Sequence, residues 1–291
     1  MKIGIIGKGF VGNAVYQKFK SFFDLYVFDL KVELSNSSFN KLVDNCKVIF
    51  ICLPTPMNND GSCNVEIVRS VMTRLNKVTN AIVINKSTVI PGTTEIFNKE
   101  FKNLQIVYNP EFLRERNSVE DFKNQNRIIL GGHTKATKYL KKIYNKVFPT
   151  ANIIETSSRD AEMIKYFTNV FLANKVSFAN EMYELCNALN LNYNKIVEHV
   201  ILDKRLGKSH WAVPGPDGDH GFGGHCLPKD LSAIIKMTED LAVTNNVLKS
   251  IQKTNNKLRK NKDWEKMEGR AVINNNINNN NIWAIYSHQN Q

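Results

Sequence analysis

The first twelve residues constrain the fold of this chain more than any other stretch. The apolar run Lys2–Ile6 leads directly into Gly-Lys-Gly-Phe-Val-Gly at residues 7–12, and an amphipathic stretch follows. A glycine-rich turn between a buried strand and a helix is typical of the first β-α-β unit of a parallel sheet. The sequence therefore predicts that the chain opens with a strand, a tight turn and a helix that packs on the strand.

Short runs rich in Val and Ile alternate with helix-like stretches through the first half of the chain. The candidate strands are Lys2–Ile6, Leu25–Asp29, Lys47–Leu53, Ala81–Asn85, Gln105–Tyr108 and Arg127–Leu130. Strands without polar alternation are typical of a parallel sheet that is buried on both faces. We therefore expect residues 1–156 to form an α/β domain with a Rossmann-like, doubly wound sheet.

The pattern changes near Ser157. Residues 159–190 contain no proline or glycine, and their apolar residues recur at helical spacing. We predict one long helix of roughly 45 Å, at 1.5 Å per residue, which opens an all-α central domain over residues 157–255. Such a helix is either a spine between domains or subunits, which would make this a dimerisation domain, or a bent core helix within one protomer.

The chain becomes polar after Asn255 and carries asparagine repeats at residues 274–276 and 278–281. Asparagine repeats cannot bury enough apolar surface to fold. We therefore expect residues 256–291 to form a largely disordered tail.

The formal net charge is +12, with 39 Lys and Arg against 27 Asp and Glu. The lysines are scattered and accompany no nucleic-acid recognition motif, so a basic surface that attracts a multiply anionic small substrate is favoured over nucleic acid. No apolar run approaches the length of a membrane span, and the N-terminus lacks the pattern of a signal peptide. These features predict a cytoplasmic protein without a membrane partner.

Five cysteines are present, at residues 46, 52, 63, 186 and 226. They form no Cys-x-x-Cys pair and no Cys/His cluster at zinc spacing, so we expect no metal site. Cys46 and Cys52 lie in an apolar run, where a buried cysteine acts as a small hydrophobic residue. Cys226 stands apart because its surroundings are rich in glycine and charge.

The glycine turn also predicts a dinucleotide site, formed by Gly7, Gly9, Phe10, Val11 and Gly12 with Asp29. Glycines let the backbone approach a pyrophosphate, the helix N-terminus supplies oriented N–H groups, and a carboxylate after the second strand holds the ribose hydroxyls. Asp29 favours NAD over NADP because it would repel a 2′-phosphate. Because Lys31 is nearby, NADP is not excluded as the cofactor.

Five further segments need a joint explanation. They are Leu53-Pro54-Thr55-Pro56, Lys86-Ser87-Thr88-Val89, the segment from Asn109 to Glu115, the pair Lys165 and Asn169, and the block Gly-Phe-Gly-Gly-His-Cys-Leu-Pro-Lys-Asp at residues 221–230. In this order they resemble the UDP-glucose/GDP-mannose dehydrogenase family over about residues 1–255. The resemblance implies an NAD-dependent enzyme that oxidises the C6 alcohol of a nucleotide sugar to a carboxylate.

Cys226 is the catalytic candidate that this chemistry requires. A four-electron oxidation passes through an aldehyde, which a thiol can hold as a thiohemiacetal until a second hydride leaves and a thioester is hydrolysed. The resemblance assigns Lys165 to alkoxide and oxyanion stabilisation and Asn169 to orienting a hydroxyl or water. It makes Glu111 and Asp230 the acid–base carboxylates, and Thr88 a residue that holds the hydrolytic water.

The resemblance also implies binding residues. Those expected near the cofactor are Thr55, Ser87, Thr88 and Glu115, and those near the substrate are Glu111, Phe112, Leu113, Lys165, Asn169, Phe222 and Gly223. Arg205 matches an arginine that reaches the substrate of a neighbouring subunit, which implies a homodimer built on the long helix.

Two features depart from the family. Its members normally carry a third domain for the uridine and diphosphate, whereas only 61 of the 291 residues follow Asp230, so we expect that domain to be missing and nucleotide recognition to be weaker. His225 resembles the branch that oxidises N-acetylhexosamines, whereas Phe222 and the Pro-Lys-Asp ending resemble the UDP-glucose branch. We favour UDP-glucose.

Two alternatives remain open. A hydroxyacid dehydrogenase of the 6-phosphogluconate-like group shares the Rossmann domain, the long helix and a Lys-x-x-x-Asn pair, but it needs no cysteine. A non-catalytic NAD-binding remnant would explain a missing domain but not the intact set of candidate catalytic residues.

Overall fold

The computed structural model describes residues 1–273, which form two compact units. Among the described residues, the first unit comprises residues 1–55 and 64–165, and the second comprises residues 56–63 and 166–273. The sequence pattern predicts a boundary at residue 156, whereas the division falls at residue 165, inside a long helix. The composition changes where this helix begins, but its first turns belong to the first unit.

Seven strands form the sheet of the first unit, in the order β2-β1-β3-β4-β5-β6-β7. They are β1 (Lys2–Ile6), β2 (Asp24–Phe28), β3 (Val48–Ile51), β4 (Ile82–Asn85), β5 (Gln105–Tyr108), β6 (Arg127–Gly131) and β7 (Asn152–Thr156). Neighbouring strands are parallel except β5 and β6, which meet antiparallel at Tyr108 and Gly131.

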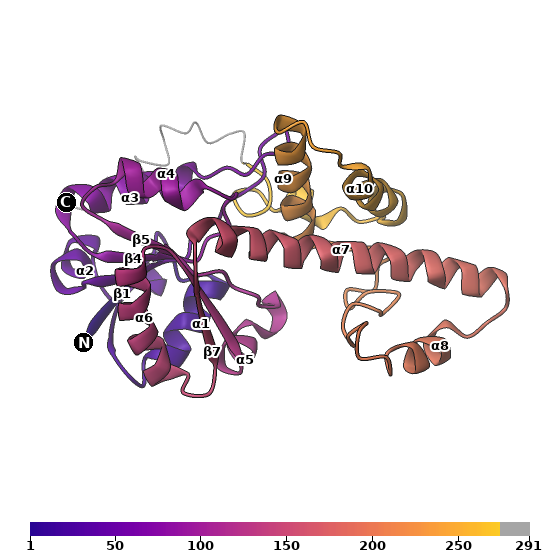
Figure 1. Ribbon diagram of the computed structural model, residues 1–291, viewed down its shortest axis with the longest axis horizontal. Helices are drawn as coiled ribbons and strands as arrows, with labels where there is room; N and C mark the ends of the chain where they lie inside the picture. Colours follow the sequence, from indigo (N-terminus) through magenta and orange to yellow (C-terminus); the bar gives the residue numbers. More distant parts are fainter. Residues whose placement is uncertain (274–291) are drawn as a thin grey trace. The chain divides into compact units, whose positions relative to one another are not determined.

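Helices cover both faces of this sheet (Figure 1). One face packs against α1 (Phe10–Phe19), α5 (Ser118–Lys123) and α6 (Thr134–Val147), and the other against α2 (Phe39–Asn45), α3 (Glu66–Val78) and α4 (Thr93–Glu100). Short 3₁₀ turns lie at η1 (Val32–Leu34) and η2 (Glu115–Asn117). The predicted Rossmann-like, doubly wound architecture is confirmed.

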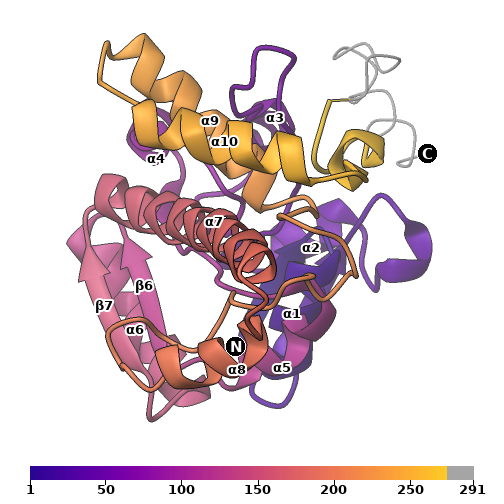
Figure 2. The same ribbon diagram turned by 90° about the vertical axis from the view of Figure 1, so that its right-hand side faces the viewer.

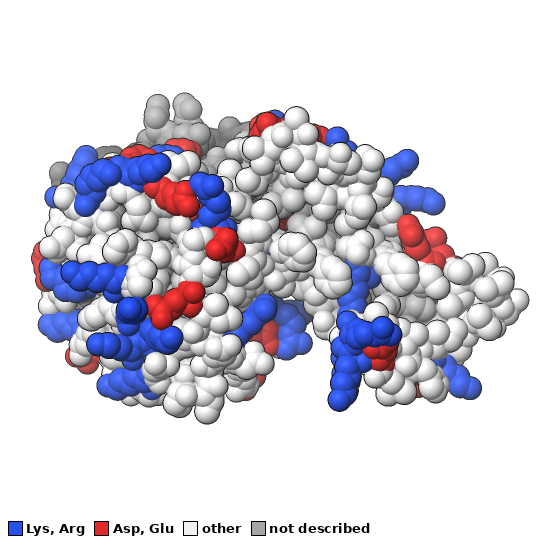
Figure 3. Space-filling view, viewed as in Figure 1, with Lys and Arg blue, Asp and Glu red and all other residues white. Residues whose placement is uncertain are grey.

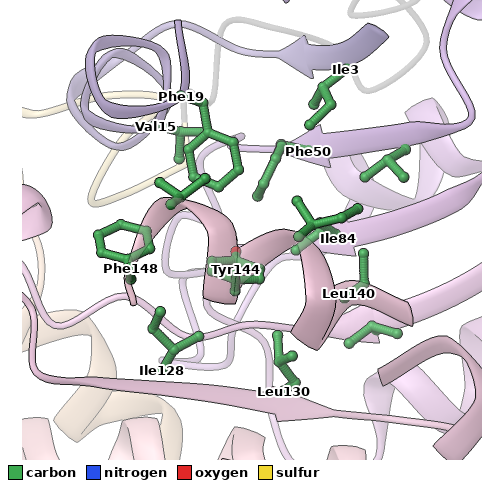
Figure 4. Packing of buried hydrophobic residues seen from close by; sticks show 14 of the residues in the cluster. Ile3, Val15, Phe19, Phe50, Ile84, Ile128, Leu130, Leu140, Tyr144 and Phe148 are labelled. Carbon is green, nitrogen blue, oxygen red and sulfur yellow. The ribbon is translucent and has the colours of Figure 1, made fainter. Parts of the chain in front are cut away.

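Aromatic side chains pack against one another in the core under α1 and α6 (Figure 4). The ring of Phe19 meets Phe50 edge-on at 5.2 Å between centroids and Tyr144 at 5.7 Å. Edge-to-face pairs of this kind add about 0.5–1.5 kcal/mol each beyond the area that they bury. The helices are thereby fixed against the strands whose ends carry the candidate site.

Strand β7 and the direction of β6 differ from the prediction. In β7 only Ile153 is fully buried, because this strand is at the edge of the sheet. The segment of β7 therefore lacks the uninterrupted apolar run from which the central strands are predicted. Strand β6 runs antiparallel to β5 because of how the chain crosses from one strand to the next. No local sequence pattern predicts that direction.

The second unit contains α7 (Ser158–Ala188), α8 (Tyr193–Val200), α9 (Leu227–Asp240), α10 (Asn246–Leu258) and the turn η3 (Asp263–Lys266). The 31-residue helix α7 confirms the predicted long helix. Helices α9 and α10 pack on its second-unit part through a small core, as Figure 2 shows along α7. This core includes Ala173, Leu231, Ile235 and Ile251.

Part of the predicted tail belongs to the second unit. Helix α10 continues to Leu258, and Trp264 and Ala271 are buried. Met57 forms a bridge with Val272, which ties the segment to the loop at residues 56–63. This segment is polar in composition because ion pairs, as well as buried apolar side chains, hold it in the second unit. The rest of the predicted tail, residues 274–291, lies outside the described residues.

Lys and Arg are scattered among Asp and Glu on the face shown in Figure 3. Among residues 1–273, no helix combines the length and the apolar character that a bilayer span requires.

Candidate active site

The candidate cofactor residues of the first unit lie where the strand order reverses. Strand β1 is flanked by β2 and β3, so the chain leaves the sheet in opposite directions at this point. In open parallel sheets, ligands bind outside the carboxyl ends of the strands at such a switch point. The predicted residues Gly7, Asp29, Thr55 and Ser87 follow β1, β2, β3 and β4 at this edge.

Each of the three glycines in the turn is present for a different physical reason. A Cβ on Gly7 would lie 2.5 Å from the carbonyl oxygen of Cys52, and one on Gly12 would lie 1.9 Å from that of Gly7. Gly7 also has a φ of +87°, which other residues rarely adopt. A Cβ on Gly9 would meet no described atom within 4 Å, apart from its chain neighbours. Gly9 therefore leaves space over the N-terminus of α1, where Phe10 and Val11 form the first turn.

Asp29 holds the turn from the end of β2. Its two carboxylate oxygens accept the backbone N–H groups of Lys8 at 2.6 Å and Lys31 at 2.9 Å. Each oxygen keeps a lone pair for a further donor. The open space at Gly9, the N-terminus of α1 and this carboxylate together fit the pyrophosphate and ribose of a dinucleotide.

Thr55, Ser87 and Thr88 are buried beside this edge. Ser87 Oγ accepts the Leu53 N–H at 3.0 Å, and the Ser87 N–H donates to Asn85 Oδ1 at 3.1 Å. The ends of β3 and β4 are thereby joined, which fixes the backbone of both predicted cofactor segments.

Glu111 and Lys165 form a buried ion pair in the first unit. Lys165 Nζ lies 2.9 Å from Glu111 Oε1 and donates a 2.6 Å hydrogen bond to the Glu111 carbonyl oxygen. The other carboxylate oxygen accepts the Leu113 N–H at 2.7 Å. Burial by itself raises the pKa of Glu111, but Lys165, the Leu113 N–H and the charge of Lys86 outweigh it and hold that pKa below its ordinary value.

The second unit holds the remaining candidate catalytic residues. Cys226 is the N-cap of α9, and Lys229 and Asp230 lie in its first turn. Asp230 is 1% exposed; it accepts from Asn169 Nδ2 at 2.6 Å and pairs with Lys229 Nζ at 2.5 Å. Burial would lower the pKa of Lys229, but Asp230 and the thiols of Cys63 and Cys226 outweigh this and raise it.

This arrangement suits a nucleophilic thiol. A helix N-terminus carries partial positive charge, and an ammonium group within reach of the sulfur adds to it. Cys226 has both, from α9 and from Lys229. Asn169 follows Lys165 by four residues on α7, so both project from one side of that helix.

Asn255, on α10, holds the glycine loop that leads to Cys226, and the sequence analysis missed it. Its Oδ1 accepts the Phe222 N–H at 2.7 Å, and its Nδ2 donates to the Phe222 carbonyl at 3.0 Å. The side chain thus pairs with the loop as a neighbouring strand would. The helical spacing of Leu248, Ile251 and Asn255 could have revealed that Asn255 lies on the buried face of its helix.

Arg259 is the second missed residue, at the C-cap of α10. Its side chain is 2% exposed and pairs with Asp217 at 2.5 Å and Asp263 at 3.2 Å. Asp263 in turn accepts the Gly224 N–H at 3.0 Å. A Cβ on Gly223 would lie 2.1 Å from Arg259 Nη2. The glycine predicted to admit the sugar is therefore required by packing against the guanidinium group.

Other predicted residues lie at the margins of these clusters. Glu115 is exposed in η2, and Arg205 is exposed and bonded to Asp203. Phe112 is half-buried with Lys165 Nζ 5.5 Å from its ring centroid, and Leu113 packs against the core of the first unit. Within residues 1–273, no group of His, Cys, Asp and Glu side chains could hold a metal ion.

The glycine turn allows a matched pair of variants. Gly9→Ala is expected to leave the melting temperature unchanged but to weaken NAD binding about tenfold or more, because the methyl group enters the space reserved for the pyrophosphate. Gly12→Ala is expected to lower the melting temperature, because its Cβ overlaps the Gly7 carbonyl. Calorimetric titration with NAD and thermal unfolding would measure both. Equal effects of the two variants on NAD affinity and stability would contradict this reading.

The fold and the glycine turn define a dinucleotide-binding protein of the Rossmann class. Residues 29–148 match the NAD binding domain of the UDP-glucose/GDP-mannose dehydrogenase family, and residues 159–257 match the central domain of the same family. The chain belongs to the UDP-glucose/GDP-mannose dehydrogenase family. The predicted cofactor, NAD, is confirmed by the first match.

Individual relatives agree with this membership. The chain is 35% identical over 219 residues to a UDP-glucose 6-dehydrogenase of Rickettsia prowazekii, covering 72% of this chain and 49% of the relative. It is 35% identical over 271 residues to the YtcA protein of Bacillus subtilis, covering 87% and 59%. The chain thus spans about half to three fifths of the length of these curated relatives.

Solved structures show the same fold. A UDP-glucose dehydrogenase from Pyrobaculum islandicum matches with a TM-score of 0.79 and 29% identity, over 88% of this chain and 68% of that one. A 3-hydroxyisobutyrate dehydrogenase from Mycobacterium tuberculosis matches with a TM-score of 0.69 and 17% identity, over 88% and 92%. The second match shows a shared fold alone.

Proposed function

We propose that this chain is an NAD-dependent dehydrogenase that oxidises the C6 alcohol of a UDP-sugar, UDP-glucose in the first instance, to a carboxylate. The observation that carries the proposal is the position of Cys226 at the N-terminus of α9, beside Lys229 and Asp230. A simple alcohol oxidation needs no thiol, whereas a four-electron oxidation needs a group that retains the aldehyde. Family membership supports the same chemistry.

NAD, when bound, accepts the hydride that leaves the sugar carbon in each of the two oxidations. The turn at residues 7–12 would hold its pyrophosphate and Asp29 its ribose, with Thr55, Ser87 and Thr88 lining the same sheet edge. Glu115 would lie near the nicotinamide.

The first oxidation requires that the C6 hydroxyl lose its proton and that the C6 carbon lose a hydride. In the proposal Lys165 stabilises the developing alkoxide, and the Asn169 carboxamide orients the hydroxyl. The ion pair with Glu111 fixes the direction of the Lys165 side chain. The proposed substrate contacts are Phe112 and Leu113 in the first unit and Phe222 and Gly223 in the second.

The second oxidation uses the thiol. Cys226 sulfur bonds to the aldehyde carbon, and a proton goes to its oxygen, which gives a thiohemiacetal. Loss of a hydride from carbon and a proton from oxygen then leaves a thioester. Water adds to this carbon and the carbon–sulfur bond breaks, so the acid leaves and the thiolate is restored. Glu111 and Asp230 take and return the protons of that water, which Thr88 helps to hold.

The experiment that tests the function counts NADH formed per UDP-glucose consumed by the purified chain. Two NADH per sugar, with UDP-glucuronate as product, is the expected result. One NADH per substrate, or turnover of a hydroxyacid in place of a nucleotide sugar, would establish a single oxidation and overturn the proposal. Absence of NADH with UDP-glucose, UDP-N-acetylmannosamine and GDP-mannose would favour an NAD-binding protein without this activity.

We also propose that two copies of the chain associate through α7. Five apolar side chains on the second-unit part of α7 are 36–70% exposed: Phe167, Phe171, Phe178, Met182 and Leu185. At 3.6 residues per turn they fall within about 60° of the helix circumference. A continuous apolar stripe of this kind is typical of a protein–protein interface, and a second copy offers the same stripe in a two-fold arrangement. Arg205 would then serve the partner's substrate.

The double variant Phe171→Asp, Phe178→Asp is expected to convert a dimer into a monomer, because two charges would be buried at the centre of the interface. Sedimentation velocity would measure the change in mass. Leu202→Asp is the matched control, since Leu202 is 73% exposed but is not on α7. A wild-type monomer, or a dimer that survives the double variant, would refute the interface.

A further inference from the structure

Lys86 is a buried lysine for which the proposed reaction has no role. It follows β4 and immediately precedes Ser87 and Thr88, and it is 3% exposed. An ammonium group in such surroundings is unfavourable unless hydrogen bonds and opposite charges compensate for the lost water. The contacts of Lys86 therefore indicate what it does.

Lys86 holds Asn109 by two atoms. Its Nζ donates to Asn109 Oδ1 at 2.8 Å and to the Asn109 carbonyl oxygen at 3.2 Å. Tyr144 donates to the same Oδ1 at 2.6 Å, and Asn109 Nδ2 donates to the Ile129 carbonyl at 2.7 Å. Asn109 is thereby held by hydrogen bonds to three elements: the residue after β4, helix α6 and strand β6.

This fixed residue determines where Glu111 lies. Only Pro110 separates them, and its ring limits φ to about −65°. Because Asn109 is fixed by its hydrogen bonds, the direction from which Glu111 contacts Lys165 is restricted as well. The charge of Lys86 also acts on Glu111 directly, as one of the charges that hold the pKa of this carboxyl down.

We propose that Lys86 is a positioning residue for Glu111: it anchors Asn109 and thereby determines where the Glu111 carboxylate lies against Lys165. The catalytic consequence rests on the proposed function, whereas the effect on Glu111 itself does not. The hydrogen bonds of Lys86 go to Asn109, so it acts on Glu111 through its neighbours.

The action is expected to depend on pH. The pKa of Lys86 is lowered to about 8, chiefly by burial and to a smaller extent by Lys165, while Cys52 and Glu111 oppose the shift. Tyr144, whose phenol is also buried, stays neutral in this range because burial raises its pKa. Lys86 thus carries its charge at pH 7 and loses it above about pH 8, where its hold on the ionised Glu111 weakens.

The test measures the titration of Glu111 directly, by carbon-13 NMR of protein labelled at the glutamate carboxyl groups, with Glu111→Gln to assign the signal. In Lys86→Met the midpoint of Glu111 is expected to shift to higher pH, and in the exposed control Lys47→Met it should stay at the wild-type value. An unshifted midpoint in a folded Lys86→Met protein would overturn the proposal, whether or not the chain turns over a sugar.

Lys86→Arg is the second variant, because it keeps the positive charge. It also allows the test to be made if the Lys86→Met protein does not fold. Its Glu111 midpoint should match the wild type, and the alkaline limb of its kcat profile should move to higher pH. Lys86→Met is expected to lower kcat by about 10- to 100-fold with little change in the KM for NAD. A fall in stability with wild-type titration and an unchanged pH profile would assign Lys86 a purely structural role.

Discussion

The Cys226→Ser variant is expected to lose at least about 10³-fold in the rate of acid formation, because a serine hydroxyl is a far weaker nucleophile than a thiolate at neutral pH. The first oxidation does not require the sulfur, so any remaining NADH should accompany an aldehyde, at one NADH per sugar. Spectrophotometric NADH formation together with chromatographic analysis of the sugar product would measure both quantities.

Cys63→Ser is the control for this experiment, since Cys63 is half-buried and acts on Lys229 as Cys226 does, but it is not the N-cap of α9. The control should retain two NADH per sugar. A Cys226→Ser protein that still forms two NADH per sugar would show that the thiol is dispensable and would favour a different mechanism.

Thiol alkylation supports the assignment without requiring turnover. Burial raises the pKa of Cys46 to about 11 and that of Cys52 to about 12, so neither carries appreciable thiolate at pH 8. Loss of activity in step with labelling of the Cys226 peptide, and not of the Cys63 or Cys186 peptide, would therefore identify the reactive sulfur.

The central strands and the long helix could be read from the sequence because their signals are local. Ile3, Ile49 and Val83 are buried on strands packed on both faces, and burial of that kind leaves an uninterrupted apolar run. Strand β7 lies at the sheet edge with a single fully buried residue, so its pattern was too weak. The antiparallel placing of β6 depends on the path of the whole chain.

The candidate site shows the same division. Lys165 and Asn169 could be paired from their spacing on one helix, and the Cys226 block from its order of residue types. Asn255 and Arg259 were missed because their roles depend on which loop packs against α10. The polar composition after Asn255 also resembled a tail, although Arg259 is buried among aspartates.

Replacing Lys165 with methionine is expected to lower the free energy of unfolding at pH 7 by about 3–5 kcal/mol, because it leaves the buried Glu111 carboxylate without its partner. Both side chains are 5% exposed or less, so water cannot replace the lost charge. Urea unfolding followed by circular dichroism would measure the loss. The double variant Lys165→Met, Glu111→Gln should recover much of it, because no unpaired charge then remains.

The sign of the pH dependence distinguishes this loss from a packing defect. In the wild type the pKa of Glu111 is lower in the folded than in the unfolded state, so its contribution is present at neutral pH and is lost as the pH falls through the folded value. In Lys165→Met, burial dominates and raises that pKa, so the variant is stabilised by protonation. The difference between the two proteins should therefore be largest near pH 7 and shrink towards pH 4. A difference that stays constant over this range would show that the ammonium group acts by filling space and that its charge contributes nothing to the folded state.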